Sequence, residues 1–285
     1  MKRGNLLGTC FRSEFRECRG GEALDQTASS HVRFDQFERA QTRGDEGRGT
    51  CEGIARETLR RIDRSYTGDG QTSTLPLAVD SMNNDMDRGG DNATSLYHNI
   101  DSFQSNPTAL GLRHYRQSSE LNLNVDGTSP RETRIEGLLD SMGDIPPGGL
   151  AYVRVGIQRT DASGPADSGH VLLIQHLPDD AHGAGNRPAD RYAIFDPNNG
   201  VFTYDSLEQM RTGLRGYMNT AYSEDNYAAA PNRVLFFSPP SSRDWGALPE
   251  TASVPPPNGN NNLLEPPDLL NFLRPHLASH HDELR

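Results

Sequence analysis

The 285-residue sequence is nearly free of lysine, since Lys2 is the only lysine among 28 basic residues. Two explanations fit: a GC-rich coding bias, or work in a compartment where lysine is a liability because it accepts ubiquitin and arginine does not. Acidic residues number 39 and the formal net charge is −11. The composition therefore lacks the positive charge typical of proteins that bind nucleic acid or an anionic membrane surface.

Cysteine and long apolar runs are also scarce. The three cysteines, Cys10, Cys18 and Cys51, cannot form a closed set of disulfide bonds, so a reducing compartment is expected. No apolar run approaches the ~20 residues of a transmembrane helix. The first fifteen residues lack the apolar core of a secretory signal peptide, and we expect no transmembrane segment.

Composition divides the chain into three parts. Residues 1–48 are polar and rich in Arg and Gly, and they predict a flexible leader with a short helix near Val32–Arg39. Residues 49–238 hold the periodic patterns of a folded domain. Residues 239–285 are rich in Pro and Asn and predict a low-complexity tail, with a short amphipathic helix at Leu269–Leu273.

Within residues 49–238 the pattern predicts helices first and mainly strands afterwards. Apolar residues at helical spacing predict helices over Cys51–Asp63, Glu132–Met142 and Ser206–Tyr217, and the polar stretch 65–130 is expected to hold one or two short helices among loops. Apolar runs predict strands over 151–157, 170–176, 191–195, 201–204 and 234–237. A helical part followed by an antiparallel sheet predicts an α+β fold.

Cys51 stands at the first turn of a predicted amphipathic helix. The unpaired N–H groups and the positive end of the helix dipole at such a position favour a thiolate. The backbone N–H of the same residue could bind an oxyanion. These features suit a nucleophile, although a small buried cysteine that happens to begin a helix would give the same pattern.

A histidine and a carboxylate follow in the order that a catalytic triad requires. His170 begins a strongly apolar strand, and Asp196 ends the next one, where its carboxylate could hold the imidazole in one tautomer. His176 lies on the same face of the first strand but at its far end, where a solvated edge is expected. An Asp-Pro pair alone indicates only a turn. The order Cys, His, Asp on a helix start, a strand start and a strand end argues for a triad.

Three segments carry a family resemblance: GTCEGIARETL around Cys51, SGHVLLI around His170 and FDPNNGVFTYDS around Asp196. Together they resemble the YopT-like family of bacterial effector cysteine proteases, which includes AvrPphB-type members and consists of papain-like enzymes injected by type III secretion. The resemblance covers roughly residues 49–237. It implies a papain-like α+β fold, Cys51 as nucleophile, His170 as general base and acid, and Asp196 as the residue that orients His170.

The resemblance also implies a role and a place of action. It indicates a secreted virulence protease that cleaves a host protein, such as a lipid-modified GTPase or a kinase, in the host cytoplasm or at the host plasma membrane. AvrPphB-type members cleave themselves near the N-terminus and are then acylated. Gly8 could correspondingly accept myristate and Cys10 palmitate, which would give peripheral membrane association.

The chain departs from the family pattern at two points. His170 and Asp196 are 26 positions apart, more than a tight hairpin needs, and residues 178–190 look like the insertion. Papain-like enzymes also carry an amide side chain shortly before the nucleophile for the oxyanion hole. Here the candidate is Gln41, ten positions before Cys51, so a hole built partly from the backbone N–H of Cys51 is the safer expectation.

Two other functions use the same residues. A glutamine deamidase or transglutaminase would form the same thioacyl intermediate on a side-chain amide, and an inactive papain-like module would only bind a host protein. Competent side chains at all three triad positions favour an active enzyme over an inactive module. No cofactor is expected, and no metal, because His276, His280 and His281 near the C-terminus have no further ligand cluster beside them.

Overall fold

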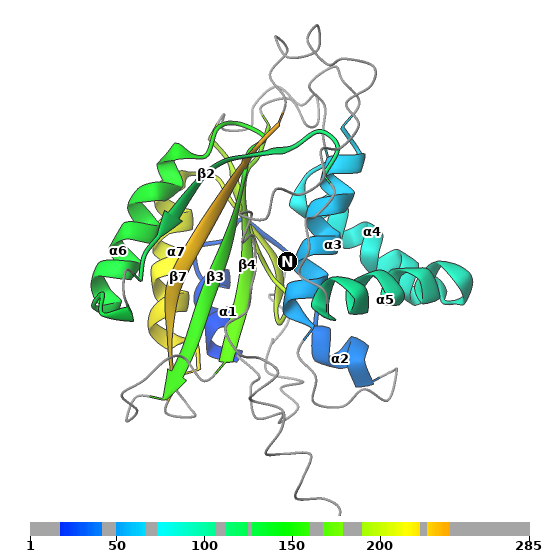
Figure 1. The fold of residues 1–285 in the computed structure, drawn as a ribbon, viewed down its shortest axis with the longest axis horizontal. Coiled ribbons are helices and arrows are strands. Elements are labelled where there is room, and N and C mark those ends of the chain that lie inside the picture. The colour runs from blue at the N-terminus through cyan, green and yellow to red at the C-terminus, as the bar shows by residue number, and fades with distance from the viewer. Residues whose placement is uncertain are drawn as a thin grey trace, which may run out of the picture.

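The computed structural model describes residues 18–41, 50–66, 73–105, 112–124, 127–159, 168–178, 190–222 and 227–239. Their centre is a seven-stranded antiparallel sheet in the order β1-β6-β5-β4-β3-β7-β2 (Figure 1). The strands are β1 (Ser30–Arg33), β2 (Arg116–Asn122), β3 (Leu150–Arg159), β4 (Ser168–His176), β5 (Tyr192–Asp196), β6 (Gly200–Tyr204) and β7 (Tyr227–Ser238).

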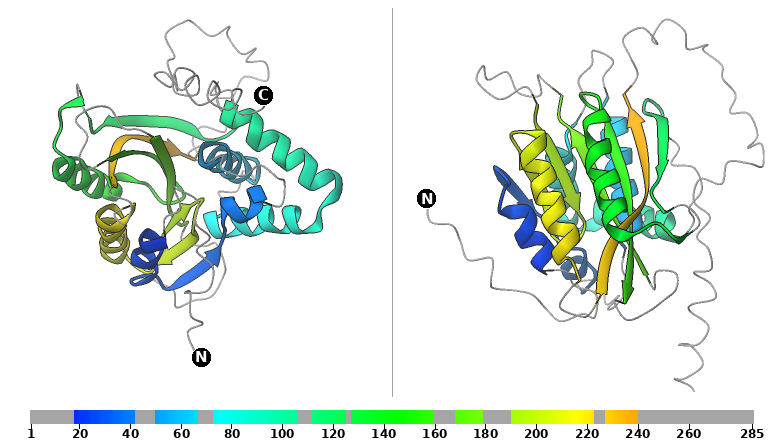
Figure 2. Two further views of the ribbon diagram at one scale, coloured as in Figure 1. Left: turned by 90° about the horizontal axis from the view of Figure 1, so that it is seen from below. Right: turned by 90° about the vertical axis from the view of Figure 1, so that its left-hand side faces the viewer.

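Helices lie on both faces of this sheet (Figures 1 and 2). On one face, α6 (Arg131–Ser141) and α7 (Leu207–Thr220) pack against the strands, and α1 (Cys18–Asp25) packs on α7. On the other face, α3 (Cys51–Arg64) and α4 (Leu75–Arg88) contact the strands, and α5 (Gly90–Ser105) packs on both of these helices. The short helix α2 (Gln36–Gln41) follows β1, and the 3₁₀ turn η3 (Met142–Asp144) follows α6.

The central strands are apolar on both faces because their side chains alternate between two cores. In β4, Leu172 and Ile174 join the core beneath α6 and α7, whereas Val171 and Leu173 join the core beneath α3 and α4. β3, β5, β6 and β7 alternate in the same way. A sheet covered on both faces accounts for the nearly continuous apolar runs in the sequence. The predicted α+β class with an antiparallel sheet is confirmed.

Residues 18–41 differ from the flexible leader that the sequence predicts. They form α1, β1 and α2, and β1 is an edge strand of the sheet, with Ser30 opposite Thr203 and Arg33 opposite Gly200. The short helix expected near residues 32–39 begins only at Gln36. The polar sequence of this segment does not indicate these elements, because pairing with β6 and packing on α7 stabilise them. The other residues assigned to the leader, and residues 240–285 of the tail, lie outside the described residues.

Residues 65–130 were expected to hold only short helices, and the structure contains two long ones. α4 has 14 residues and α5 has 16. Their many Asn, Asp and Ser residues lower intrinsic helix propensity. Each nevertheless buries one apolar stripe, made in α4 by Leu75, Val79, Met82 and Met86. Packing of that stripe outweighs the weak propensity.

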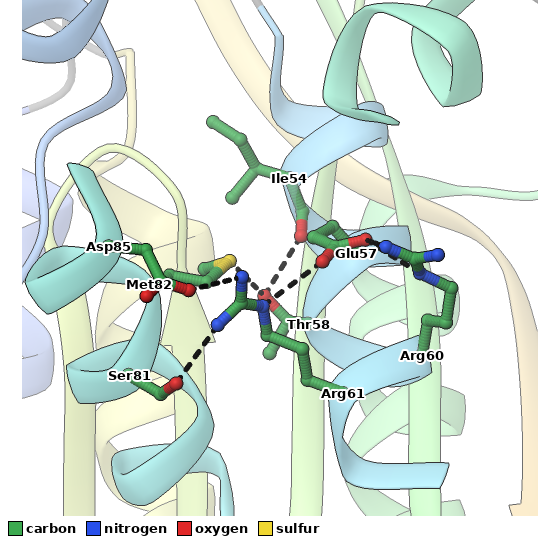
Figure 3. A network of polar contacts seen from close by, with 8 residues as sticks. All are labelled: Ile54, Glu57, Thr58, Arg60, Arg61, Ser81, Met82 and Asp85. Atoms are coloured by element: carbon green, nitrogen blue, oxygen red, sulfur yellow. Dashed lines mark hydrogen bonds and ion pairs between the residues drawn. The ribbon is translucent and has the colours of Figure 1, made fainter. Parts of the chain in front are cut away.

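Polar contacts join α3 to α4 (Figure 3). Arg61 donates from Nη1 to Ser81 Oγ at 2.9 Å and from Nη2 to Asp85 Oδ2 at 2.8 Å. Its Nε donates to Glu57 Oε1 at 3.0 Å, and Arg60 Nε donates to Glu57 Oε2 at 2.7 Å. Two arginines thus neutralise the buried Glu57 carboxylate. The contacts fix the position of α3 beside α4.

The buried carboxylate of Asp63, near the end of α3, gives a prediction for stability. It accepts the backbone N–H groups of Arg113, His114 and Tyr115 at 2.8, 2.8 and 2.7 Å and so holds the segment before β2. We expect Asp63→Ala to lower the free energy of unfolding by about 3 kcal/mol, because it leaves three donors without their acceptor. Denaturant unfolding measures this change.

The matched control is Asp87→Ala on α4. Asp87 is 62% exposed and forms an ion pair with Arg39, so its removal should change stability little. Equal losses in the two variants would contradict the role given to Asp63.

Candidate active site

Cys51 is the first residue of α3, as the sequence predicts. Thr50 precedes it as N-cap without a side-chain cap bond. Among the residues that the structure describes, no acceptor contacts the Cys51 N–H, and the thiol lies 3.9 Å from the carbonyl oxygen of Gly169. As the first residue of α3, the nucleophile candidate carries beside its sulfur a backbone N–H that the helix itself does not satisfy.

The first turn of α3 is held by α5. Gln104 Oε1 accepts the N–H of Gly53 at 2.9 Å, which satisfies one donor of the turn. A Cβ on Gly53 would lie 2.2 Å from the carbonyl oxygen of Ile100, so only glycine permits this approach of the two helices. The contact positions the helix end that carries Cys51.

His170 and Asp196 meet inside the protein. His170 Nε2 lies 2.7 Å from Asp196 Oδ1, and the two residues are 4% and 0% exposed. The pair forms although 26 positions separate them, because β4 and β5 are neighbours in the sheet, with Leu173 opposite Phe195. Most of the intervening insertion, residues 179–189, lies outside the described residues.

The turn between β5 and β6 fixes the Asp196 carboxylate. Its Oδ1 also accepts the backbone N–H of Asn198 at 2.9 Å, and its Oδ2 accepts Asn199 Nδ2 at 2.7 Å. Gly200 closes the turn with φ 112°, a value that favours glycine, and a Cβ there would lie 2.2 Å from the Val32 carbonyl oxygen. The carboxylate therefore meets His170 in one orientation.

The environment of His170 favours its protonated form. Burial opposes a charge on the imidazole, but the Asp196 carboxylate and its hydrogen bond, together with a hydrogen bond to the Cys51 thiol, raise the pKa of His170 to about 10. Because Nε2 faces Asp196, Nδ1 is the ring nitrogen left for Cys51. This arrangement can hold a thiolate and an imidazolium side by side.

Glu52, next to the nucleophile, is kept away from this chemistry by two arginines. Its Oε1 accepts Arg56 Nε at 2.7 Å and Arg154 Nη2 at 3.1 Å. Burial alone would raise the pKa of the Glu52 carboxyl, but the charges of Arg154 and Arg56 outweigh it and lower that pKa. Glu52 is therefore ionised and paired, which leaves Asp196 as the carboxylate that His170 contacts.

Gln36 is a buried amide residue near Cys51 that the sequence analysis did not single out. It is the first residue of α2 and is 3% exposed, and its Oε1 accepts the N–H of Thr50 at 2.9 Å. Gln41, the expected candidate, is the last residue of α2, and its side chain lies outside what the structure describes. The sequence did contain a sign that a helix begins here, because Asp is a preferred N-cap residue. In the structure Asp35 Oδ1 accepts the N–H of Glu38, as an N-cap side chain does.

His176 contradicts its predicted place at a solvated edge. It is 6% exposed, its Nδ1 lies 2.8 Å from the carbonyl oxygen of Ile145, and its ring stacks on Tyr192. The segment before β3 covers this end of β4, which the sequence pattern of β4 alone cannot reveal.

Some predicted residues lie outside the described part of the chain, namely Gly8, Cys10, His276, His280 and His281. Within the described part, no three His, Cys, Asp or Glu side chains gather as a metal ion would require. None of the helices described there has the length and apolar character to cross a membrane.

Comparison with known proteins gives structural likeness only. No protein-family model and no curated protein matches the chain. The crystal structure of the Pseudomonas avirulence protein AvrPphB is similar with 13% identity and a TM-score of 0.38, over 75% of this chain and 99% of that one. PatoxP, a cysteine protease-like domain of the Photorhabdus asymbiotica toxin PaTox, is similar with 14% identity and a TM-score of 0.41, over 74% of this chain and 56% of that one.

Proposed function

We propose that the chain is a papain-like cysteine protease in which Cys51 is the nucleophile, His170 the general base and acid, and Asp196 the residue that orients His170. The observation that supports the proposal is the 2.7 Å contact of His170 Nε2 with Asp196 Oδ1 inside the protein, with Cys51 Sγ 3.9 Å from the carbonyl oxygen of Gly169, the residue before His170. A cysteine nucleophile is activated when a base takes its proton and a third group orients that base; His170 would be the base and Asp196 the orienting group.

Cys51 and His170 would each act in acylation, which forms a thioacyl-enzyme, and again in deacylation, which hydrolyses it. The Cys51 thiolate attacks the carbonyl carbon of a peptide bond, and the oxyanion that forms is received by the Cys51 N–H at the start of α3. The His170 imidazolium donates a proton to the leaving amine, which departs and leaves a thioacyl-enzyme. His170 then takes a proton from water, and the resulting hydroxide attacks the thioacyl carbon, which releases the carboxylic acid and restores the Cys51 thiolate beside the His170 imidazolium.

The three motifs around the triad residues support a biological setting. Their resemblance to the YopT-like family suggests an effector delivered by type III secretion that cleaves a host protein in the host cytoplasm or at the host plasma membrane. A lipid-modified GTPase or a kinase would be the substrate. Self-processing followed by acylation of Gly8 and Cys10 would bring the enzyme to the membrane.

The test is to incubate the chain with a eukaryotic cell lysate and to identify new protein N-termini by sequencing, with the Cys51→Ala variant as control. New termini that depend on Cys51 are expected. Conversion of Gln to Glu without a cut would replace the protease by a deamidase, and binding without any covalent change would replace it by an inactive module.

A further inference from the structure

A buried polar network lies beside the proposed triad, with Asn198 at its centre. Asn198 Nδ2 donates to the hydroxyl of Tyr222 at 3.3 Å, and its Oδ1 accepts a hydrogen bond from Gln36 Nε2. The three residues are 5%, 4% and 3% exposed. They come from three places in the chain: the turn after β5, the segment that follows α7, and the start of α2. Asn198 thus joins segments that share no local sequence.

The network links Asp196 to the residue before Cys51 through side chains other than that of His170. The backbone N–H of Asn198 donates to Asp196 Oδ1 at 2.9 Å. On the other side, Gln36 Oε1 accepts the backbone N–H of Thr50, the residue before Cys51, at 2.9 Å. The Gln36 backbone N–H also donates to the Pro197 carbonyl oxygen at 2.9 Å, so the Asn198 side chain adds a second link, which fixes the Gln36 amide that holds Thr50.

Tyr222 has an unusual backbone that points to a specific task. Its φ is 63°, and it is the only non-glycine residue with positive φ among the described residues. A bulky side chain in this region is strained, and such strain persists only where the surroundings enforce it. The conformation places the ring edge-on to His170, with centroids 6.3 Å apart and an interplanar angle of 66°. Tyr222 therefore contacts both Asn198 and the imidazole.

We propose that Asn198 and Tyr222 are positioning residues of this site. Asn198 sets the distance between the turn that carries Asp196 and the turn that carries Cys51. Tyr222 holds the Asn198 amide and closes one side of the His170 ring against water. The inference rests on the proposed function for the roles of Cys51 and His170, but its test does not require that any protein be cleaved.

The test measures how the rate of Cys51 alkylation by iodoacetamide depends on pH. Cys10→Ala and Cys18→Ala are introduced first, so that Cys51 is the only thiol. Asn198→Ala and Tyr222→Phe are then compared in this background. The matched control is Tyr204→Phe, because Tyr204 is buried as Tyr222 is and its hydroxyl donates to the Leu24 carbonyl oxygen at 3.1 Å, and none of its described hydrogen bonds reaches Cys51, His170 or Asp196.

We expect Asn198→Ala to slow alkylation by about 10-fold near pH 6 and to shift the profile upward by about one pH unit, since one unit corresponds to a tenfold change in the thiolate fraction. Tyr222→Phe should act in the same direction by about 3-fold. Tyr204→Phe should lower the melting temperature without moving the profile.

The proposal is wrong if folded Asn198→Ala and Tyr222→Phe keep the parent profile, or if Tyr204→Phe shifts it equally. If Asn198→Ala does not fold, the alkylation profile of Tyr222→Phe alone tests the proposal: an upward shift supports it and an unchanged profile contradicts it. A shifted profile in a chain whose parent cuts no protein would overturn the protease proposal and leave the positioning roles intact.

Discussion

Replacing Cys51 by alanine is expected to reduce peptide cleavage by about 10⁶-fold. A methyl group cannot form the thioacyl intermediate, and no other described thiol lies beside His170. Peptide cleavage is measured by single-turnover kinetics with a substrate taken from the lysate experiment. The free energy of unfolding should change by no more than about 1 kcal/mol, because the side chain removed is small.

Cys18→Ala is the matched control for this variant. Cys18 is also the first residue of a helix, but it begins α1, which packs on α7 on the opposite face of the sheet from α3. We expect the Cys18→Ala rate to equal that of the wild type. Full activity in folded Cys51→Ala would show that another group is the nucleophile.

Asp196→Asn is expected to lower the cleavage rate by about 10⁴-fold, since loss of the orienting carboxylate leaves the imidazole in the wrong tautomer. The change is isosteric but removes the charge that favours the His170 imidazolium. The control is Asp190→Asn at the other end of β4. Asp190 is 78% exposed and lies 3.6 Å from Nε2 of His176, so its replacement should leave the rate unchanged. A comparable loss in both variants would contradict the assignment of Asp196.

The same variant should change how stability depends on pH. The pKa of His170 is raised from its ordinary value of 6.5 to about 10, so the imidazolium contributes stability that is fully present below pH 6.5 and lost as the pH rises through about 10. Without the Asp196 charge the pKa of His170 rises less. The free energy of unfolding of Asp196→Asn should therefore fall less steeply over this interval than that of the wild type. Denaturant titrations at several pH values measure the slope, and equal slopes would show that Asp196 does not raise that pKa.

The three proposed triad positions could be identified from sequence because each stands at the border of a strongly patterned element. The apolar spacing of α3 marked its start at Cys51, and the apolar run of β5 marked its end at Asp196. The apolar run of β4 placed His170 near the start of that strand, which begins at Ser168. The remaining expectation, that these three side chains meet, came from their order and from the family resemblance. The hydrogen bond of His170 to Asp196 at 2.7 Å agrees with that expectation.

The residues around these positions were harder to find. Gln36 and Asn198 contact each other across 162 positions, and no periodic pattern links a polar residue to a partner that far away. The contacts of Tyr222 with Asn198 and His170 likewise join residues that lie far apart in the sequence. In residues 65–130 the apolar stripes were present, but the many Asn, Asp and Ser residues obscured them.

The sequence by itself determined the elements whose signal is local: α3, α6, α7, the hairpin of β5 and β6, and the residues at their ends. Helical or strand periodicity arises from neighbours a few positions apart, so it can be read without the fold. Only the tertiary structure decided that residues 30–33 form an edge strand, that His176 is buried, and that Asn198 links the turn of Asp196 through Gln36 to the residue before Cys51. Each of these depends on pairing or burial between distant segments, whose free energy is gained only when the whole sheet is assembled.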